Sequence, residues 1–321
     1  SVGIMPHLKT YDASCLAYRQ GKTRRGSYAA YLDISHPDMM QFLEMRKPTG
    51  DQNVRCLNLH HGINIPDRFM ELIERCMQDT DADDGWNLTD PHNGEIRETV
   101  SAKELWQKIL ELRMETGEPY LHFIDTSNRA MPEFQKKLGL RIHQSNLCSE
   151  IILPTNKERT AVCCLSSVNL EYYDAWSKNQ LFLRDMAEML DNVLQFFIDN
   201  APDAVSRARF SAQRERSIGI GALGFHAYLQ NRIFSHIRTR VDEANLQLGS
   251  ERGEAPDAEG TGRRFSHTMA IAPNASSSII MGNTSPSIEP LRANAYRQDT
   301  LSGAFLNKNK YLDAIITTEC E

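Results

Sequence analysis

The spacing of apolar residues predicts several amphipathic helices along the chain. Leu105, Ile109 and Leu112 recur at helical intervals after Ser101, which is followed three residues later by a glutamate in the spacing of a capping box. This pattern predicts a helix over 102–116. Further helices are expected from Pro37, over 66–77 and over 184–199. In the last of these the apolar positions are Met186, Met189, Leu190, Val193, Phe196 and Phe197.

Short apolar runs between these helices predict strands. The expected strands are 28–33, 119–125, 147–153, 161–166 and 267–273. Residues 79–98 are polar and contain Asp84-Gly85 and Asn93-Gly94, so this stretch is expected to be a surface loop. Because strands alternate with helices, the pattern predicts an α/β fold with parallel strands.

Composition narrows the class of protein. The chain has 321 residues, of which 40% are hydrophobic, and a formal net charge of −6, which disfavours wholesale binding to nucleic acid. No stretch approaches the roughly 20 apolar residues that a membrane span requires, so no membrane partner is expected. The seven cysteines are odd in number and form no C-x-x-C pair, which favours a reducing cytoplasm over a disulfide framework or a zinc site. Ser1 is not expected to be a natural start, because the chain has no initiator methionine.

Three short motifs resemble functional sites but have simpler structural explanations. Gly219–Gly224 has the spacing of a dinucleotide-binding fingerprint but follows a polar run rather than a strand, so a closely packed glycine-rich helix is expected. His60 and His61 have no further metal ligand at a useful spacing, and no metal site is expected. Cys163 and Cys164 should point to opposite faces of a strand, so at most one of them should face a site.

The segment around Cys148 contains the pattern with the most chemical meaning. Asn146, Cys148 and Glu150 occupy alternate positions, and in an extended strand they would share one face. An amide, a thiol and a carboxylate would then line one wall of a cavity. The pattern alone leaves a functional site and a half-polar surface strand as alternatives.

At this point a resemblance becomes specific. Five segments resemble, in order, those of ribonucleotide reductase large subunits: RQGKTRRGSYAAYLD, SNLCSEI, AVCCLSSVNL, GIGALGFHAYLQ and MAIAPNASSSIIMGNTSPSIEP. The resemblance implies a ten-stranded α/β barrel, with 1–321 as a single catalytic barrel domain. It also implies a chain that is incomplete at both ends, without the N-terminal regulatory region and the C-terminal tail.

The resemblance assigns roles to the residues that match the family motifs. Cys148 would become a thiyl radical that takes the 3′-hydrogen of a ribonucleotide, and Glu150 would act as general base on the 3′-hydroxyl. Asn146 would orient the substrate hydroxyls and the Glu150 carboxylate. Cys163 would supply reducing equivalents together with a second cysteine, and an external thiol would reset the resulting disulfide.

Two further matches concern substrate and effector. The expected substrate-binding residues are Leu147, Pro273, Asn274, Ala275, Ser276, Ser277 and Ser278. A turn of small residues that opens a helix offers N–H groups and hydroxyls to a phosphate. The expected specificity loop contains Gln20, Gly21, Arg24 and Arg25, with Arg24 as the base-sensing arginine and Arg25 as the neighbouring option.

The resemblance also implies cofactors and partners. No cofactor is expected to bind this chain directly, since the radical would come from a small subunit that contains a metal. The other expected partners are a ribonucleoside diphosphate, nucleoside triphosphate effectors, thioredoxin or glutaredoxin, the missing portions of the large subunit and a second copy in a dimer. The sequence leaves a triphosphate substrate open.

The match is imperfect at three points. The partner of Cys163 lies far upstream in the family, and the surroundings of Cys15 do not resemble it. Cys320 is single and does not replace the family's tail pair, and the connection from 229–233 to 234–236 looks shortened. The chain alone is therefore expected to turn over no substrate. The alternatives are an adenosylcobalamin-dependent reductase, a non-catalytic nucleotide-binding or assembly fragment, and a thiol hydrolase with His143 as base.

Overall fold

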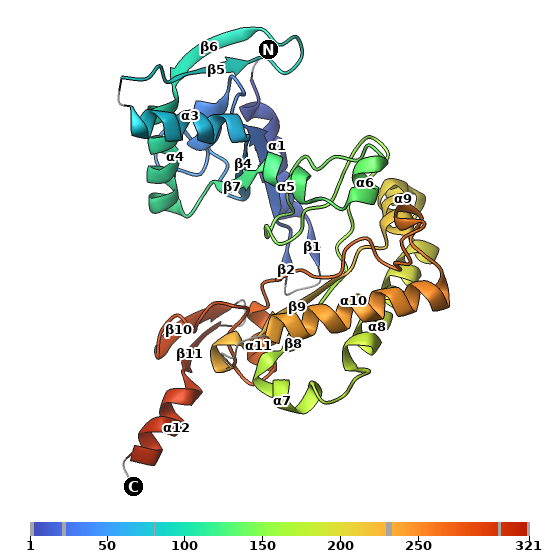
Figure 1. Cartoon of the computed structure of the whole chain (residues 1–321). Helices are drawn as coiled ribbons and strands as arrows, with labels where there is room; N and C mark the ends of the chain where they lie inside the picture. The colour runs from blue at the N-terminus through green and yellow to red at the C-terminus, as the bar shows by residue number, and fades with distance from the viewer. Residues whose placement is uncertain (1–2, 21–23, 80, 229–232, 301–302, 320–321) are drawn as a thin grey trace. The chain divides into compact units, whose positions relative to one another are not determined.

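The computed structural model describes residues 3–20, 24–79, 81–228, 233–300 and 303–319 (Figure 1). The chain divides into two compact units. The first unit comprises Ser1–Met131 and Ile142–Leu153, and the second comprises Pro132–Arg141 and Pro154–Glu321. The expectation of one catalytic barrel domain over 1–321 stays a prediction.

The first unit is built on a parallel sheet in the order β3-β4-β7. Its strands are β3 (Tyr28–Asp33), β4 (Leu59–Ile65) and β7 (Tyr120–Phe123). Its helices are α1 (Met5–Ala17), α2 (Met39–Leu43), α3 (Asp67–Gln78), α4 (Ala102–Thr116) and α5 (Ile124–Ala130). Ile63 and Ile65 pack with Phe42, Phe69 and Ile109 in a buried core, so the even-numbered positions of β4 face away from it.

The helix predictions for this unit are confirmed. At the start of α4, the Ser101 hydroxyl accepts a hydrogen bond of 3.1 Å from the Glu104 N–H, as the capping spacing predicted. The strand at 28–33 is confirmed with the same bounds.

The expected surface loop at 79–98 is wrong. It contains β5 (Gly85–Thr89), which pairs in an antiparallel hairpin with β6 (Ile96–Ser101). Trp86 and Leu88 are buried and alternate with exposed neighbours. The alternation extends over only 5 residues and includes polar ones, so composition alone does not identify it as a strand. The Asn93-Gly94 turn is confirmed, because Gly94 has a φ of 74° and donates to the Asp90 carbonyl at 2.8 Å.

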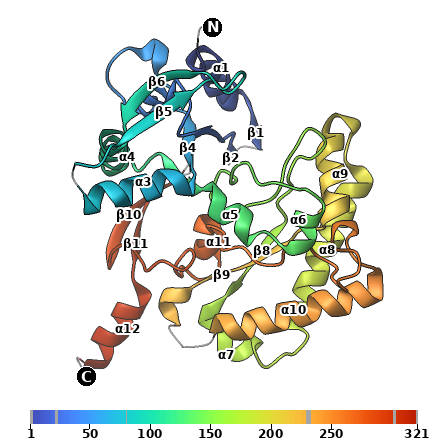
Figure 2. The same ribbon diagram turned by 45° about the horizontal axis from the view of Figure 1, so that its top comes forward.

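The second unit contains a parallel pair of strands and most of the helices. The strands are β8 (Leu165–Asn169) and β9 (Gly219–Leu223). The helices are α6 (Glu133–Lys137), α7 (Tyr173–Trp176), α8 (Phe182–Asn200), α9 (Ser206–Glu215), α10 (Ile233–Arg252), α11 (Ala275–Ile280) and α12 (Lys310–Glu319). An antiparallel hairpin of β10 (Ala295–Thr300) and β11 (Gly303–Lys308) precedes α12. Helices α8 and α10 pack together (Figure 2) around a core that includes Leu190, Leu194, Leu248 and Phe265.

The glycine motif is a strand, not the expected helix. A Cβ at Gly221 would lie 2.4 Å from the Ala270 carbonyl oxygen, and one at Gly219 would lie 2.2 Å from a Leu165 methyl. The prediction that the glycines allow close packing is therefore correct, whereas the predicted helix is wrong. Met269 forms a single parallel bridge with Ile220, so the strand expected at 267–273 is reduced to one bridge.

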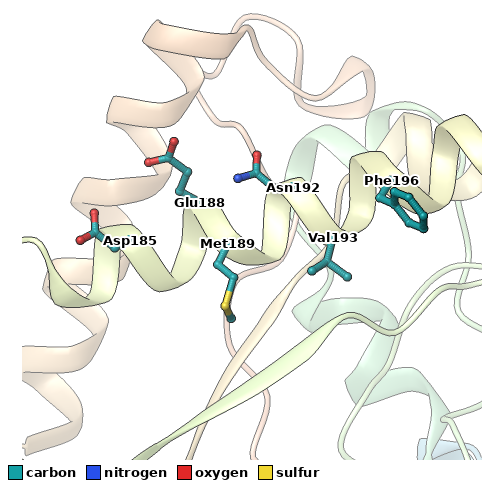
Figure 3. Close-up of a pocket in the computed structure, with 6 residues that line it drawn as sticks. All are labelled: Asp185, Glu188, Met189, Asn192, Val193 and Phe196. Carbon is teal, nitrogen blue, oxygen red and sulfur yellow. The ribbon is translucent and has the colours of Figure 1, made fainter.

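Helix α8 is confirmed, but only part of its apolar surface is buried. Leu190 packs inward, whereas Met189, Val193 and Phe196 are 49%, 54% and 71% exposed. Figure 3 shows these three side chains beside Asp185, Glu188 and Asn192 on the open surface of the helix.

The second unit also encloses a polar cluster. The Arg159 guanidinium lies 2.5 Å from one Asp257 oxygen and 3.3 Å from Glu215 Oε1, and all three residues are buried. The Ser217 hydroxyl lies 3.2 Å from Glu215 Oε2 and 3.4 Å from His267 Nδ1. Burial raises the pKa of Glu215 to about 7, and burial lowers the pKa of His267 to about 4.

The described strands form five small sheets, and they do not close into a barrel. The fifth sheet is the short hairpin of β1 (Arg19–Gln20) and β2 (Arg24–Arg25). Among the described residues, no helix is both long and apolar enough to cross a membrane.

Candidate active site

The segment that contains Cys148 is a turn and not the strand expected at 147–153. The Asn146 N–H donates to the Ile151 carbonyl at 3.0 Å, and the Ser149 N–H donates to the Asn146 carbonyl at 3.2 Å. Ser149 has a φ of 64°, in the left-handed region that no strand residue occupies. Backbone groups within 146–151 therefore form hydrogen bonds with one another, and they do not offer the regular series of donors and acceptors that pairing with a neighbouring strand requires.

The turn nevertheless brings the predicted polar groups together. The Asn146 side-chain amide donates to Glu150 Oε2 at 2.8 Å, and its Oδ1 accepts from the Ile151 N–H at 3.1 Å. Cys148 lies between them in sequence and is exposed. The predicted proximity of amide and carboxylate is therefore correct, although a turn creates it and not the alternation of a strand.

Side chains of the first unit hold the approach to this turn. Asn128 binds both backbone groups of Ile142, accepting from its N–H and donating to its carbonyl, each at 3.0 Å. Asn64 donates to the His143 carbonyl at 2.9 Å. These bonds take the place of a sheet ladder, so the segment is fixed without being a strand.

Asn64 belongs to a row of polar residues that crosses the sheet. Asp33, Asn64 and His122 are aligned on β3, β4 and β7, and Asn64 binds both neighbours, at 2.9 Å to Asp33 and 2.8 Å to His122. His122 also lies 2.8 Å from the Ser127 hydroxyl. Burial lowers the pKa of His122, which favours the neutral ring in this row.

Tyr31 lies one step along the same face of the sheet. A Cβ at the aligned Gly62 would lie 2.3 Å from the Tyr31 ring, so the ring fits across β4 only because residue 62 is glycine. The Tyr31 hydroxyl lies 2.6 Å from the Ser145 hydroxyl and 3.4 Å from the Asn146 carbonyl. The ring also meets His122 edge-on, with 6.1 Å between centroids.

Tyr120 is aligned with Gly62 and stacks on His60, whereas His61 faces the buried core next to Phe42. Burial raises the pKa of Tyr120, and the negative charge of the Glu118 carboxylate adds to this effect. Glu118 accepts from His60 and His61, and these bonds hold its pKa well below the usual range although burial opposes them. The two histidines thus form hydrogen bonds with the Glu118 carboxylate. No group of described residues is arranged to hold a metal ion.

Cys163 and Cys164 occupy different environments in the second unit, as predicted. Cys163 is exposed just before β8, whereas Cys164 is 8% exposed and its thiol faces the Leu190 carbonyl at 3.5 Å. Burial raises the pKa of the Cys164 thiol. Only Cys163 is therefore accessible to solvent or to another thiol. Its predicted redox role stays a prediction.

The predicted phosphate segment opens helix α11 in the second unit. Pro273 is exposed, and Asn274 is the residue before the helix, with its side chain bound to the Ala272 carbonyl at 2.8 Å. Ala275, Ser276 and Ser277 are exposed in the first turn, whereas Ser278 is buried and its hydroxyl donates to the Ala275 carbonyl. The segment thus presents backbone N–H groups and the exposed hydroxyls of Ser276 and Ser277 at the start of a helix. Leu147, the other predicted substrate-binding residue, belongs to the Cys148 turn in the first unit.

The predicted specificity loop coincides with the β1–β2 hairpin. Gln20 pairs with Arg24, Arg25 is exposed, and Gly21 lies outside the described residues. Cys15, rejected as the redox partner, is buried on α1, and Cys320 lies outside the described residues.

Three residues near the site were missed by sequence reasoning: Tyr31, Asn64 and Asn128. Their importance comes from the backbone groups they bind across 14 to 115 positions of sequence. The signal that could have shown Asn64 is a polar residue between two isoleucines in a buried strand.

Comparison with known proteins places these sites in a family. The model of the ribonucleotide reductase barrel domain matches residues 1–236 and 254–320. The "Ribonucleoside-diphosphate reductase large subunit" of Invertebrate iridescent virus 3 is 52% identical over 378 aligned residues, which cover 98% of this chain and 60% of the relative. The "Putative ribonucleoside-diphosphate reductase large subunit" of Frog virus 3 is 50% identical, covering 97% of this chain and 57% of the relative.

A solved structure agrees with these sequence matches. The "Actinobacillus ureae class Id ribonucleotide reductase alpha subunit" superposes with a TM-score of 0.76 at 31% identity, covering 92% of this chain and 53% of that chain. The chain thus spans between 53% and 60% of the length of these three relatives. The resemblance of the five motifs is confirmed, and this chain belongs to the ribonucleotide reductase barrel-domain family.

Proposed function

We propose that the protein to which this chain belongs reduces ribonucleoside diphosphates to deoxyribonucleotides by thiyl-radical chemistry. The observation that carries the proposal is the bond of 2.8 Å between the Asn146 amide and the Glu150 carboxylate, which flank an exposed Cys148. The family match adds that two viral relatives of this chain bear the name of ribonucleoside-diphosphate reductase large subunits.

In this mechanism the Cys148 thiyl radical takes the 3′-hydrogen atom and leaves a radical on C3′. Glu150 accepts the 3′-hydroxyl proton and later returns it, and the 2′-hydroxyl leaves as water after it gains a proton from one of the two reducing thiols. Asn146 holds the Glu150 carboxylate in place for that proton transfer. Return of a hydrogen atom from Cys148 to C3′ restores the thiyl radical.

Cys163 would supply the two electrons of the reduction together with a second cysteine. Both thiols lose a hydrogen and close to a disulfide, and thioredoxin or glutaredoxin restores them by thiol exchange. The exposure of Cys163 suits an exchange with an external thiol.

The radical is proposed to come from a small subunit that contains a metal, since the relatives are called large subunits. An adenosylcobalamin-dependent reductase is the less favoured alternative. Residues 273–278 and Leu147 would bind the substrate, and Gln20, Gly21, Arg24 and Arg25 would relay the identity of a triphosphate effector. The full protein would complete a ten-stranded barrel and form a dimer in a reducing cytoplasm.

The test is the formation of dCDP from CDP by the native polypeptide that contains these residues, with its small subunit and a dithiol. Cys148→Ser should reduce turnover to background and leave CDP affinity unchanged, because serine forms no comparable radical. A Cys148→Ser protein that still reduces CDP contradicts the proposal. CDP binding without reduction by the wild-type protein would instead indicate a nucleotide-binding fragment, and activity with adenosylcobalamin in place of the small subunit would indicate the alternative class.

A further inference from the structure

The Tyr31 hydroxyl belongs to a short chain of hydrogen bonds that ends on Asn146. Ser145 Oγ donates to the Asn146 carbonyl at 3.0 Å, so its own lone pair is available to the Tyr31 hydroxyl at 2.6 Å. Ser145 is 6% exposed, and the contact is therefore partly shielded from water. The Tyr31 hydroxyl also lies 3.4 Å from the Asn146 carbonyl oxygen, so both hydroxyls converge on that carbonyl.

The Asn146 carbonyl is the acceptor that closes the Cys148 turn. It receives the Ser149 N–H at 3.2 Å, while the side chain of the same residue holds Glu150. A fixed carbonyl therefore fixes both the turn that presents Cys148 and the amide that orients the carboxylate.

We propose that Tyr31 is a positioning residue of the radical reaction, which acts through Ser145 and Asn146 to hold Glu150 beside Cys148. The catalytic part of this inference, that Tyr31 supports the radical reaction, rests on the proposed function. Its structural part depends only on the contacts within the first unit.

The environment of Tyr31 separates this role from simple packing. Tyr31 lies on the polar face of the sheet, over a glycine whose Cβ would collide with its ring. Tyr28, on the same strand, packs against the apolar core on the opposite face. Tyr28→Phe is thus a matched control that removes the same atom from the same strand, away from the turn.

The first experiment is hydrogen exchange of the native polypeptide, followed by mass spectrometry. Tyr31→Phe keeps the ring over Gly62 and should speed exchange in peptides that cover 142–151 by about tenfold, as expected for the loss of one shielded hydrogen bond. Tyr28→Phe should leave those peptides unchanged. Unchanged exchange in Tyr31→Phe, or an equal increase in Tyr28→Phe, overturns the inference.

The second experiment measures kcat and KM for CDP in the same variants. Tyr31→Phe should lower kcat about tenfold with KM unchanged, because the contact orients the base and does not touch the substrate. Ser145→Ala should act similarly, and the double variant should lose little more than either single one, since the two hydroxyls form one path. Additive losses, a change in KM alone or an unchanged kcat contradicts the catalytic part.

The two proposals can fail separately. An inactive wild-type protein contradicts the proposed function, and the exchange experiment still decides whether Tyr31 holds the turn. An active wild-type protein with unaffected Tyr31→Phe supports the function and removes Tyr31 from it.

Discussion

The two segments that present Cys148 and Cys163 are fixed in opposite ways. The Cys148 turn is held by side chains from distant strands and helices, with Asn128, Asn64 and Tyr31 binding its approach. The segment after Cys163 enters a parallel ladder with β9, held by backbone hydrogen bonds and by glycines that permit close approach. A segment held by side chains can present an irregular turn, whereas a ladder can present only the end of a strand.

This difference predicts where each segment is vulnerable. The ladder should fail when Gly221 becomes larger, because its nearest neighbour is the backbone carbonyl oxygen of Ala270, which cannot move aside. The turn should fail when a distant polar side chain is lost, because a buried partner is then left without a hydrogen bond.

The largest effect is expected for Gly221→Ala in β9. The new Cβ would lie 2.4 Å from the Ala270 carbonyl oxygen and 2.9 Å from the Ser167 hydroxyl. The free energy of unfolding of the second unit should fall by about 3 kcal/mol, as for severe overpacking. Hydrogen exchange of peptides from this unit during urea denaturation measures it. Gly94→Ala, with open space around it, should cost about 1 kcal/mol for its left-handed φ, and the reverse order would break the comparison.

Asn64→Ala should have the next largest effect, in the first unit. It removes hydrogen bonds to Asp33, His122 and the His143 carbonyl, so the free energy of unfolding should fall by about 2 kcal/mol. Exchange should rise in peptides over 142–151 before the rest of the unit unfolds. The exposed Asn53→Ala should change stability by less than about 0.5 kcal/mol; an equal loss in both variants would show that the row of polar residues does not hold the turn.

The polar cluster of the second unit predicts two opposite pH effects. The raised pKa of Glu215 gives stability that is present below about pH 4.5 and lost as pH rises to about 7, and the lowered pKa of His267 gives stability that is lost as pH falls from about 6.5 to 4. The two largely cancel in the wild type. Glu215→Gln should therefore make stability rise between pH 4.5 and 6.5, and His267→Gln should make it fall, each by roughly 2 kcal/mol.

Denaturant titrations of the two variants across this pH range measure that prediction. Slopes of the same sign would show that the cluster does not hold both groups neutral.

The smallest effect is expected for Ser149→Gly, next to the proposed radical cysteine. Ser149 has a φ of 64°, which glycine adopts without a steric cost. The free energy of unfolding should rise by about 0.5 kcal/mol, because relief of the strain exceeds the added flexibility of the unfolded chain. Ser35→Gly, in a turn outside the left-handed region, should instead destabilise slightly in the same denaturation experiment. A loss in both variants would show that the turn at Cys148 is unstrained.

The sequence predicted what depends on local spacing. Helix α4 with its Ser101 cap and strand β3 follow from residues within a few positions of one another. The glycine motif misled because β9 needs glycine for contacts with Ala270 and Leu165, which lie elsewhere in the chain. The Cys148 strand was wrong for the same reason, since alternation is compatible with a turn when distant side chains bind its backbone.

The same distinction between local and distant contacts applies to the candidate site. Asn146, Cys148 and Glu150 were identified because they lie within one motif, and the structure joins two of them directly. Tyr31 and Asn64 were missed, because their role exists only once β3 and β4 lie beside the turn.

The burial of the other thiols has a consequence for chemical selectivity. Of the six cysteines in the part of the chain that the structure describes, Cys15, Cys56, Cys76 and Cys164 are buried, and burial raises the pKa of Cys56 to about 11. Alkylating reagents and oxidants act on exposed thiolates, so they should reach Cys148 and Cys163 first. Among the described residues, the other four thiols are therefore out of reach, and a thiol label used in limited amount should mark Cys148 and Cys163 before them.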